Sequence, residues 1–147
     1  MLDPTRGGRF FVTRLKLGAL LGDAFASHQL GAIYATGDFF GKPRPKNEAA
    51  ALRWYRRGAR RGDPECLYDL AFMILLGEGT APDPGRAIDL LEQAAERGNG
   101  EAIRLLADLH ERGAHGVAAS AAHAARWQAR LAEHLVQHPE QRREYDR

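Results

Sequence analysis

Glu65-Cys-Leu-Tyr-Asp-Leu-Ala-Phe-Met-Ile-Leu-Leu-Gly77 is a nearly continuous apolar run near the middle of the sequence. From Cys66 to Leu76, ten of the eleven residues are apolar or aromatic, and Asp69 is the exception. The run is too short to span a membrane, which takes about 20 apolar residues. A helix that is apolar on every side belongs inside a larger group of helices. We therefore predict a central, buried helix here.

The whole chain has the composition of one soluble, helical domain. Its 147 residues suffice for a sizeable core, and abundant Ala and Arg with few β-branched residues favour helix over strand. Cys66 is the single cysteine, so no intrachain disulfide forms and we expect a small buried side chain there. No secretory signal is visible, which predicts a cytoplasmic protein, or a periplasmic one if a signal peptide has been removed.

Three short signals recur along the chain at the same two intervals. A Gly-Asp or Gly-Asn dipeptide comes first, a Leu-Gly or Leu-Ala dipeptide follows eight residues later, and a single glycine ends the set. Each signal returns after 40 residues and again after 36 residues, which predicts three structural repeats. The signals are Gly22-Asp23, Gly62-Asp63 and Gly98-Asn99; Leu30-Gly31, Leu70-Ala71 and Leu106-Ala107; and Gly37, Gly77 and Gly113.

The chemistry of these signals predicts where helices begin and end. Gly37, Gly77 and Gly113 suit the left-handed residue that ends a helix, because glycine adopts it without a Cβ penalty. The Asp or Asn after each early glycine can accept a hydrogen bond from the first turn of the next helix. Each repeat is therefore a pair of helices, A then B. An unpaired helix over Thr5 to Leu21 precedes the pairs and the last B helix covers Ser120 to Val136, which makes seven helices.

These segments resemble the Sel1-like repeat, a relative of the tetratricopeptide repeat. The family pattern is roughly A-x-x-x-L-G-x-x-Y-x-x-G, a loop, and A-x-x-W-x-x-x-A-A-x-x-G, and the resemblance covers about residues 22–135. It implies an all-α fold, a short right-handed solenoid of antiparallel helix pairs. Four extra residues lengthen the loop between Asp38 and Glu48, and His110 stands at the tyrosine position of the third repeat. The first repeat matches with Ala26, Leu30-Gly31, Tyr34, Gly37, Ala51, Trp54, Gly58-Ala59 and Gly62.

The repeats divide a single domain of residues 1–147 into five parts. We expect an N-terminal capping helix over residues 1–21, repeats over 22–61, 62–97 and 98–135, and a charged tail over 136–147. Within the first repeat we expect Trp54 to be a buried wedge between its own helix and the two neighbouring A helices.

No arrangement of residues is typical of an active site. His110 and His115 superficially resemble the zinc-binding pair of His-Glu-x-x-His, but their spacing is one residue too long and Gly113 ends the helix that would hold both. His134 and His138 are four residues apart and lack a third ligand. No Ser-His-Asp or Cys-His set is readable. We therefore predict no catalysis, no metal and no cofactor.

Charge is distributed unevenly along the chain. Residues 1–62 hold 12 Lys or Arg against 4 Asp or Glu, and residues 63–147 hold 9 against 15, so the halves carry +8 and −6. One predicted helix carries a stripe of arginines that is either a patch for an acidic partner or nucleic acid, or a solvated face that keeps the protein soluble. The acidic second half argues against nucleic acid. The stripe consists of Arg53, Arg56, Arg57, Arg60 and Arg61.

The family resemblance implies a scaffold that binds a protein partner. In such solenoids the A helices line the concave surface, and a rotation of 100° per residue selects the side chains opposite the core leucines. An aromatic patch with a charged rim is typical of a protein-binding hot spot. Tyr68, Phe72 and Leu75 are either groove residues or core residues covered by neighbouring helices. The candidate partner-binding residues are Phe25, His28, Tyr68, Phe72, Leu75, Arg104, Asp108 and Glu111.

Three classes of function remain open at this stage. The first is a bacterial-type adaptor that binds another protein, and a specific version is an immunity or inhibitor protein of a toxin or secreted effector. The second is a self-assembling repeat protein, because opposite charges on the two halves permit head-to-tail stacking. The third is an enzyme, which the missing catalytic constellation disfavours. We expect a monomer or a weakly self-associating protein with no membrane span.

Overall fold

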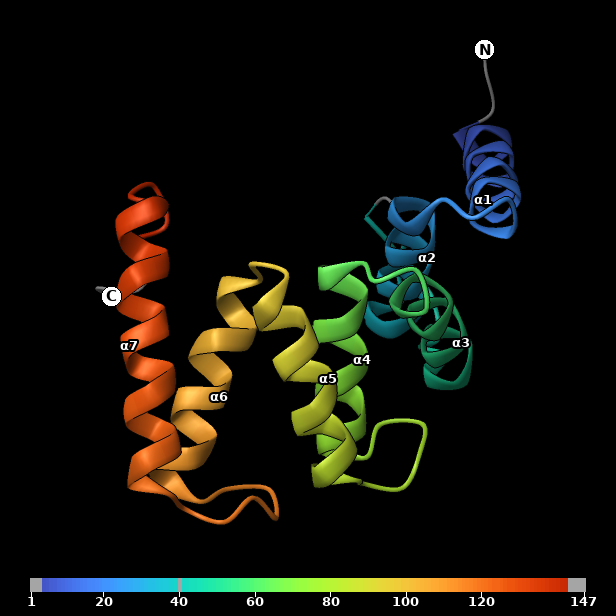
Figure 1. Cartoon of the computed structure of the whole chain (residues 1–147). Helices are drawn as coiled ribbons and strands as arrows, with labels where there is room; N and C mark the ends of the chain where they lie inside the picture. Colours follow the sequence, from blue (N-terminus) through green and yellow to red (C-terminus); the bar gives the residue numbers. More distant parts are fainter. Residues whose placement is uncertain (1–3, 40, 143–147) are drawn as a thin grey trace.

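A computed structural model describes residues 4–39 and 41–142 and shows an α-solenoid, with its helices following one another in a row from α1 to α7 (Figure 1). This confirms the predicted all-α repeat architecture and the count of seven helices within the described residues. The helices are α1 (Pro4–Leu20), α2 (Ala24–Thr36), α3 (Glu48–Ala59), α4 (Pro64–Leu76), α5 (Pro84–Glu96), α6 (Gly100–Arg112) and α7 (Ala121–Gln137).

The A helices α2, α4 and α6 begin and end as their capping residues predict. Their N-caps are Asp23, Asp63 and Asn99, and each side chain accepts a hydrogen bond from the backbone N–H three residues ahead. Their C-caps are all glycines in the left-handed region, with φ values of 70°, 74° and 65°. Identical caps give the three A helices an equal length of 13 residues, which lets them stack in register.

The core is centred on α4, as the apolar run predicts. Helix α3 packs on one side of α4 and α5 on the other, while each A helix packs most extensively against its own B helix. Seven side chains of α4 are buried, and Cys66 among them is fully covered. A helix with neighbours on several sides buries residues around most of its circumference, which explains why its sequence shows so little polar character.

Two glycines allow neighbouring helices to approach closely. A methyl group at Gly58 of α3 would overlap the Cys66 sulfur of α4, and one at Gly31 of α2 would overlap the Tyr55 ring of α3. Both glycines are buried within helices. They are therefore retained for space and not for backbone freedom, since side chains larger than hydrogen have no room there.

The prediction that Trp54 is a buried wedge was wrong. Tyr55, the next residue, is the one that lies buried between helices, with 4% of its surface exposed. Trp54 is half-buried and packs against the small cluster of Ala19, Ala26 and Leu30 beside α1. The physical reason is that the first repeat is preceded by a single helix, which covers only part of the indole.

The long first loop contains a small element that the sequence analysis did not predict. Strands β1 (Asp38–Phe39) and β2 (Lys42–Pro43) form a two-residue antiparallel hairpin. Phe39 is buried, and a methyl group at Gly8 of α1 would lie 2.6 Å from its ring. The Arg44 guanidinium covers the ring at 4.8 Å from its centre. The extra residues therefore give the hairpin a contact with α1.

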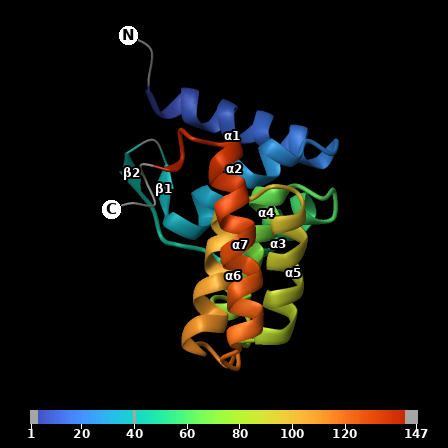
Figure 2. The ribbon, with the colours of Figure 1, turned by 60° about the vertical axis from the view of Figure 1, so that its left-hand side comes forward.

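Helix α1 runs crosswise to α5, α6 and α7 (Figure 2), and it lies at the opposite end of the row of helices from α7 (Figure 1). This orientation separates α1 from the regular stacking of the A and B helices. Most of its large apolar side chains stay exposed, and the groove described below lies between α1 and α3. The predicted charged tail begins within α7, and residues 143–147 lie outside the described residues.

Candidate functional site

Polar contacts join the three A helices to one another along one side of the solenoid. The imidazole Nε2 of His28 on α2 lies 2.9 Å from Oδ2 of Asp69 on α4. Asn99, the N-cap of α6, donates from its amide nitrogen to Oε1 of Glu65 on α4 at 3.1 Å. These contacts connect α2 to α4 and α4 to α6. We call the exposed sides of these three helices the A-helix surface.

The ionisable groups on this surface are shifted by one another and by burial. The hydrogen bond with Asp69 raises the pKa of His28, and partial burial of the imidazole opposes this rise. Burial raises the pKa of the Glu65 carboxyl, while the charge of His28 and the hydrogen bond from Asn99 oppose that change. His28 is therefore favoured in its charged form by its place between α2 and α4.

An aromatic pair stands at the middle of the A-helix surface. The rings of Tyr68 and Phe72, one helical turn apart on α4, are stacked with their centres 6.2 Å apart. Phe72 keeps 38% of its surface exposed, and Tyr68 is half-buried. Burial and the nearby Glu101 carboxylate raise the pKa of the Tyr68 hydroxyl, so it remains a neutral hydrogen-bond donor.

Glu101 and Arg104 of α6 lie close enough to Tyr68 to act on its hydroxyl, and Asp108 and Glu111 are further charged residues of the same helix. Arg104 forms an ion pair with Glu101 at 2.8 Å, and Asp108 forms one with Arg112 at 2.7 Å. Glu111 is exposed and accepts a hydrogen bond from Gln128 of α7 at 3.4 Å. The arrangement of an exposed aromatic pair beside charged side chains is the one that a protein partner can use.

Leu75 does not belong to this surface. Only 3% of its surface is exposed, and it is part of the main apolar core. The rotation rule places it opposite Leu70, but α4 is covered by α3 and α5 and therefore buries a wider arc than a helix with one neighbour. Phe25, at the N-terminal end of α2, is exposed at 67%.

The five arginines of the predicted stripe do not form a single patch. Arg57 donates from Nε to the carbonyl of Ala19 at 2.7 Å and from Nη2 to that of Leu20 at 2.8 Å, which caps the C-terminal end of α1. Arg61 lies against Gly22, and a methyl group there would come within 2.5 Å of its guanidinium. Arg56 lines a separate depression beside the loop between α4 and α5.

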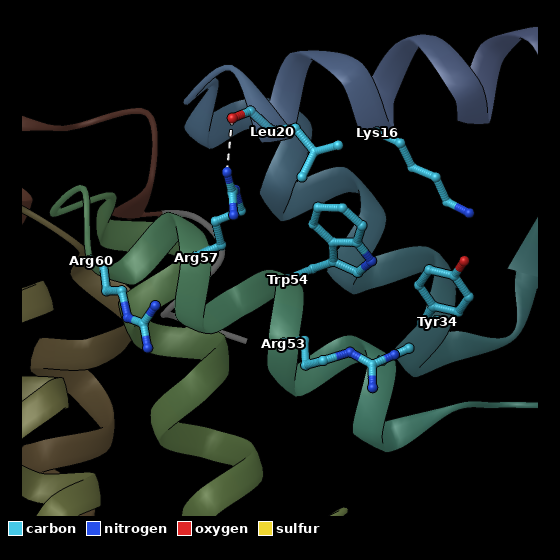
Figure 3. Close-up of a pocket in the computed structure, with 8 residues that line it drawn as sticks. Lys16, Leu20, Tyr34, Arg53, Trp54, Arg57 and Arg60 are labelled. Atoms are coloured by element: carbon cyan, nitrogen blue, oxygen red, sulfur yellow. Dashed lines mark hydrogen bonds between the residues drawn. The ribbon is translucent and has the colours of Figure 1, made fainter.

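Arg53, Arg57 and Arg60 instead share an open groove with residues of α1 and α2 (Figure 3). Lys16, Tyr34 and Trp54 complete it. These three residues were not among the predicted site residues. The indication available in the sequence was the basic content of α1 and α3, which does not reveal that the two helices line one groove.

The described residues contain no group of three or more His, Cys, Asp or Glu side chains arranged to hold a metal ion. Two histidine pairs occur: the ring centres of His110 and His123 are 4.9 Å apart, and those of His134 and His138 are 4.5 Å apart. Burial raises the pKa of the Cys66 thiol, which makes it a weak nucleophile. None of the helices in the described part of the chain is both long and apolar enough to cross a membrane.

Comparison with known proteins agrees with the repeat structure. A sequence profile of the Sel1 repeat matches residues 24–63, 64–99 and 100–134. A Sel1 repeat protein from Oxalobacter formigenes, whose crystal structure is known, is 32% identical over 83% of this chain, with a TM-score of 0.70. The chain covers 47% of that protein.

A second solved structure is c5321, a protective antigen of uropathogenic Escherichia coli strains that displays an SLR fold. It is 26% identical over 83% of this chain, with a TM-score of 0.43, and the chain covers 33% of it. The chain thus spans about half the length of the first relative and a third of the second.

The three matched segments coincide with the helix pairs α2–α3, α4–α5 and α6–α7. Sel1 repeat proteins are generally scaffolds for protein–protein interaction and are typically non-catalytic. With three consecutive matches over most of its length, the chain belongs to the Sel1 repeat family.

Proposed function

We propose that this chain is a non-catalytic adaptor that binds a protein partner through the A-helix surface. The observation that carries the proposal is the stacked pair of Tyr68 and Phe72, which keeps an aromatic ring exposed at the middle of that surface. Exposed aromatic side chains supply much contact area with little loss of side-chain freedom, and such residues dominate the binding energy of many interfaces.

The surroundings of the pair support a protein partner over a small molecule. Phe72 is exposed on α4, and Glu101 and Arg104 of α6 offer both signs of charge near its stacked partner Tyr68. Mixed charge around an apolar centre favours one orientation of a partner and disfavours partners of a single charge. His28 of α2 adds a polar group to the A-helix surface, and Asp69 of α4 holds it in place.

The test is affinity capture with the wild-type chain and a Phe72→Ala variant, followed by titration calorimetry with the captured partner. We expect the variant to lose roughly 2 kcal/mol of binding free energy, as central aromatic anchors do. Its thermal stability should change little, because the ring is already partly solvated.

The matched control is Val136→Ala on α7, which truncates another exposed apolar side chain, 80% exposed, on the last helix of the solenoid. It should bind like the wild type. Equal affinities of the wild type and Phe72→Ala for the captured partner would contradict the proposal. A large loss of stability in Phe72→Ala would assign that ring to the core.

A further inference from the structure

The groove between α1 and α3 has the size and composition of a ligand site. Its volume is about 320 Å³, at the lower end of the range for small ligand sites. Lys16 and Leu20 reach it from α1, whereas Arg53, Trp54 and Arg57 reach it from α3, so these two helices supply its opposite walls (Figure 3).

Cationic side chains dominate the groove. Lys16, Arg53, Arg57 and Arg60 line it together, and no carboxylate is among the described residues that line it. Arg57 is occupied by the carbonyl oxygens of Ala19 and Leu20. Within the described part of the chain, none of the ion pairs involves Lys16, Arg53 or Arg60. Like charges that line one groove repel one another, and an anionic ligand relieves that repulsion.

Aromatic side chains form the floor between these charges. Trp54 packs one side of its indole on the cluster of Ala19, Ala26 and Leu30 and presents the rest to the groove. Tyr34 of α2 lies next to it (Figure 3). The indole N–H is a donor only, as are ammonium and guanidinium groups. The groove therefore offers several donors and an apolar face, and of these side chains only the Tyr34 hydroxyl can also accept.

We propose that this groove binds an acidic peptide segment, with its carboxylates on Lys16 and Arg53 and an apolar side chain on Trp54. A guanidinium matches the planar carboxylate with two parallel hydrogen bonds. The apolar side chain of the peptide gains contact with the half-buried indole. This site lies apart from the A-helix surface and does not depend on what that surface binds.

The charge distribution favours a peptide over nucleic acid. Residues 63–147 carry 9 Lys or Arg against 15 Asp or Glu, a net charge of −6. A nucleic acid whose phosphates extend from the groove along α4 to α7 would meet that negative charge. A short peptide places a few carboxylates within the groove and avoids the acidic repeats.

The experiment uses the two tryptophans of the chain as separate reporters. In a ¹⁵N-labelled sample, the indole N–H signals of Trp54 and Trp127 are assigned with a Trp54→Phe variant and followed during titration. The probes are the capped peptides EEFEE and QQFQQ. We expect EEFEE to shift the Trp54 signal and leave that of the buried Trp127 unchanged, and QQFQQ to shift neither. Raising the salt from about 50 to about 300 mM should weaken binding, because exposed charges are screened.

The variant Lys16→Gln with Arg53→Gln should weaken EEFEE binding about tenfold or more. Its matched control, Arg86→Gln with Arg130→Gln, removes the same charge from α5 and α7 and should bind as the wild type does. The single variant Lys16→Gln changes only an exposed residue of α1 and leaves α3 intact. It should weaken EEFEE binding less than the double variant does. Phe72→Ala should leave peptide binding unchanged, which separates this site from the A-helix surface.

Three results would overturn the proposal. One is an unmoved Trp54 signal at about 5 mM EEFEE, where even weak binding is visible. Another is an equal loss of EEFEE affinity in the control variant Arg86→Gln with Arg130→Gln, which would show that the peptide is attracted by the overall positive charge and not by the groove. The third is tighter binding of a single-stranded oligonucleotide than of EEFEE at the same salt, lost in the Lys16 and Arg53 variant, which would assign the groove to nucleic acid.

Discussion

His28 and Asp69 lie 41 residues apart in sequence, and their side chains meet at 2.9 Å between the first and second repeats. Each is about a quarter to a third exposed, at 25% and 30%. The pair is an electrostatic link between two A helices, and its strength depends on the protonation of the imidazole.

This link makes stability depend on pH. The pKa of His28 is raised in the folded chain, so folding favours the protonated imidazole. The stabilisation is fully present below the unfolded pKa of about 6.5 and is lost as pH rises through the higher folded value. We expect the free energy of unfolding, measured by urea titration, to fall between about pH 6 and pH 8.

Variants isolate the contribution of this pair. His28→Gln and Asp69→Asn should each flatten the pH dependence, whereas His115→Gln, an exposed histidine in the loop before α7, should leave it as it is. Burial raises the pKa of the Glu65 carboxyl as well, so the pH dependence is assigned to His28 by comparing the variants and not by the wild-type curve alone. An unchanged slope in His28→Gln would show that the pair contributes nothing.

The two tryptophans should differ strongly in their effect on stability. Trp127 is 3% exposed and belongs to the main core, while Trp54 is half-buried beside α1. We expect Trp127→Ala to cost about 3–5 kcal/mol and Trp54→Ala about half as much, measured by urea denaturation. Equal losses would mean that α1 covers Trp54 more completely than the structure shows.

The difference between these tryptophans also shows what the sequence can and cannot predict. Capping residues such as Asp63 and Gly77 interact with groups in the same turn of the helix, so helix boundaries follow from local chemistry. The burial of Trp54 depends on how much of it the single helix α1 covers, and that of Leu75 on α3 and α5 both flanking α4. The groove at Lys16 and Arg53 requires α1 to lie beside α3, which no local pattern encodes.

Close packing between α3 and α4 should make Gly58 intolerant of any side chain. Gly58→Ala places a methyl group against the Cys66 sulfur, and overpacking of this kind costs about 1–3 kcal/mol. Alanine is otherwise favoured over glycine inside helices by about 1 kcal/mol, so a loss of stability would report the contact itself. Thermal unfolding measures it.

Two further variants complete this test. Gly85→Ala on α5 has its nearest neighbour at 3.7 Å, the Asp83 carboxylate, and should cause no loss. Combining Gly58→Ala with Cys66→Ala should cost less than the sum of the single changes, because the sulfur is gone. Strict additivity would place the cause of the destabilisation elsewhere.

Phe39 should control how firmly α1 is attached to the solenoid. Its ring is buried against Gly8 and covered by Arg44, so the hairpin and α1 share this contact. Terminal elements of repeat proteins open independently of the central repeats, because each contacts only its neighbours. We expect Phe39→Ala to accelerate amide hydrogen exchange in α1 while exchange in α4 stays slow, measured by mass spectrometry on peptides from the two helices.

Phe39→Leu should have a smaller effect, since it keeps most of the apolar contact. Uniform acceleration in α1 and α4 would show that the solenoid opens as a single unit, and unchanged exchange in α1 would show that other contacts hold the helix.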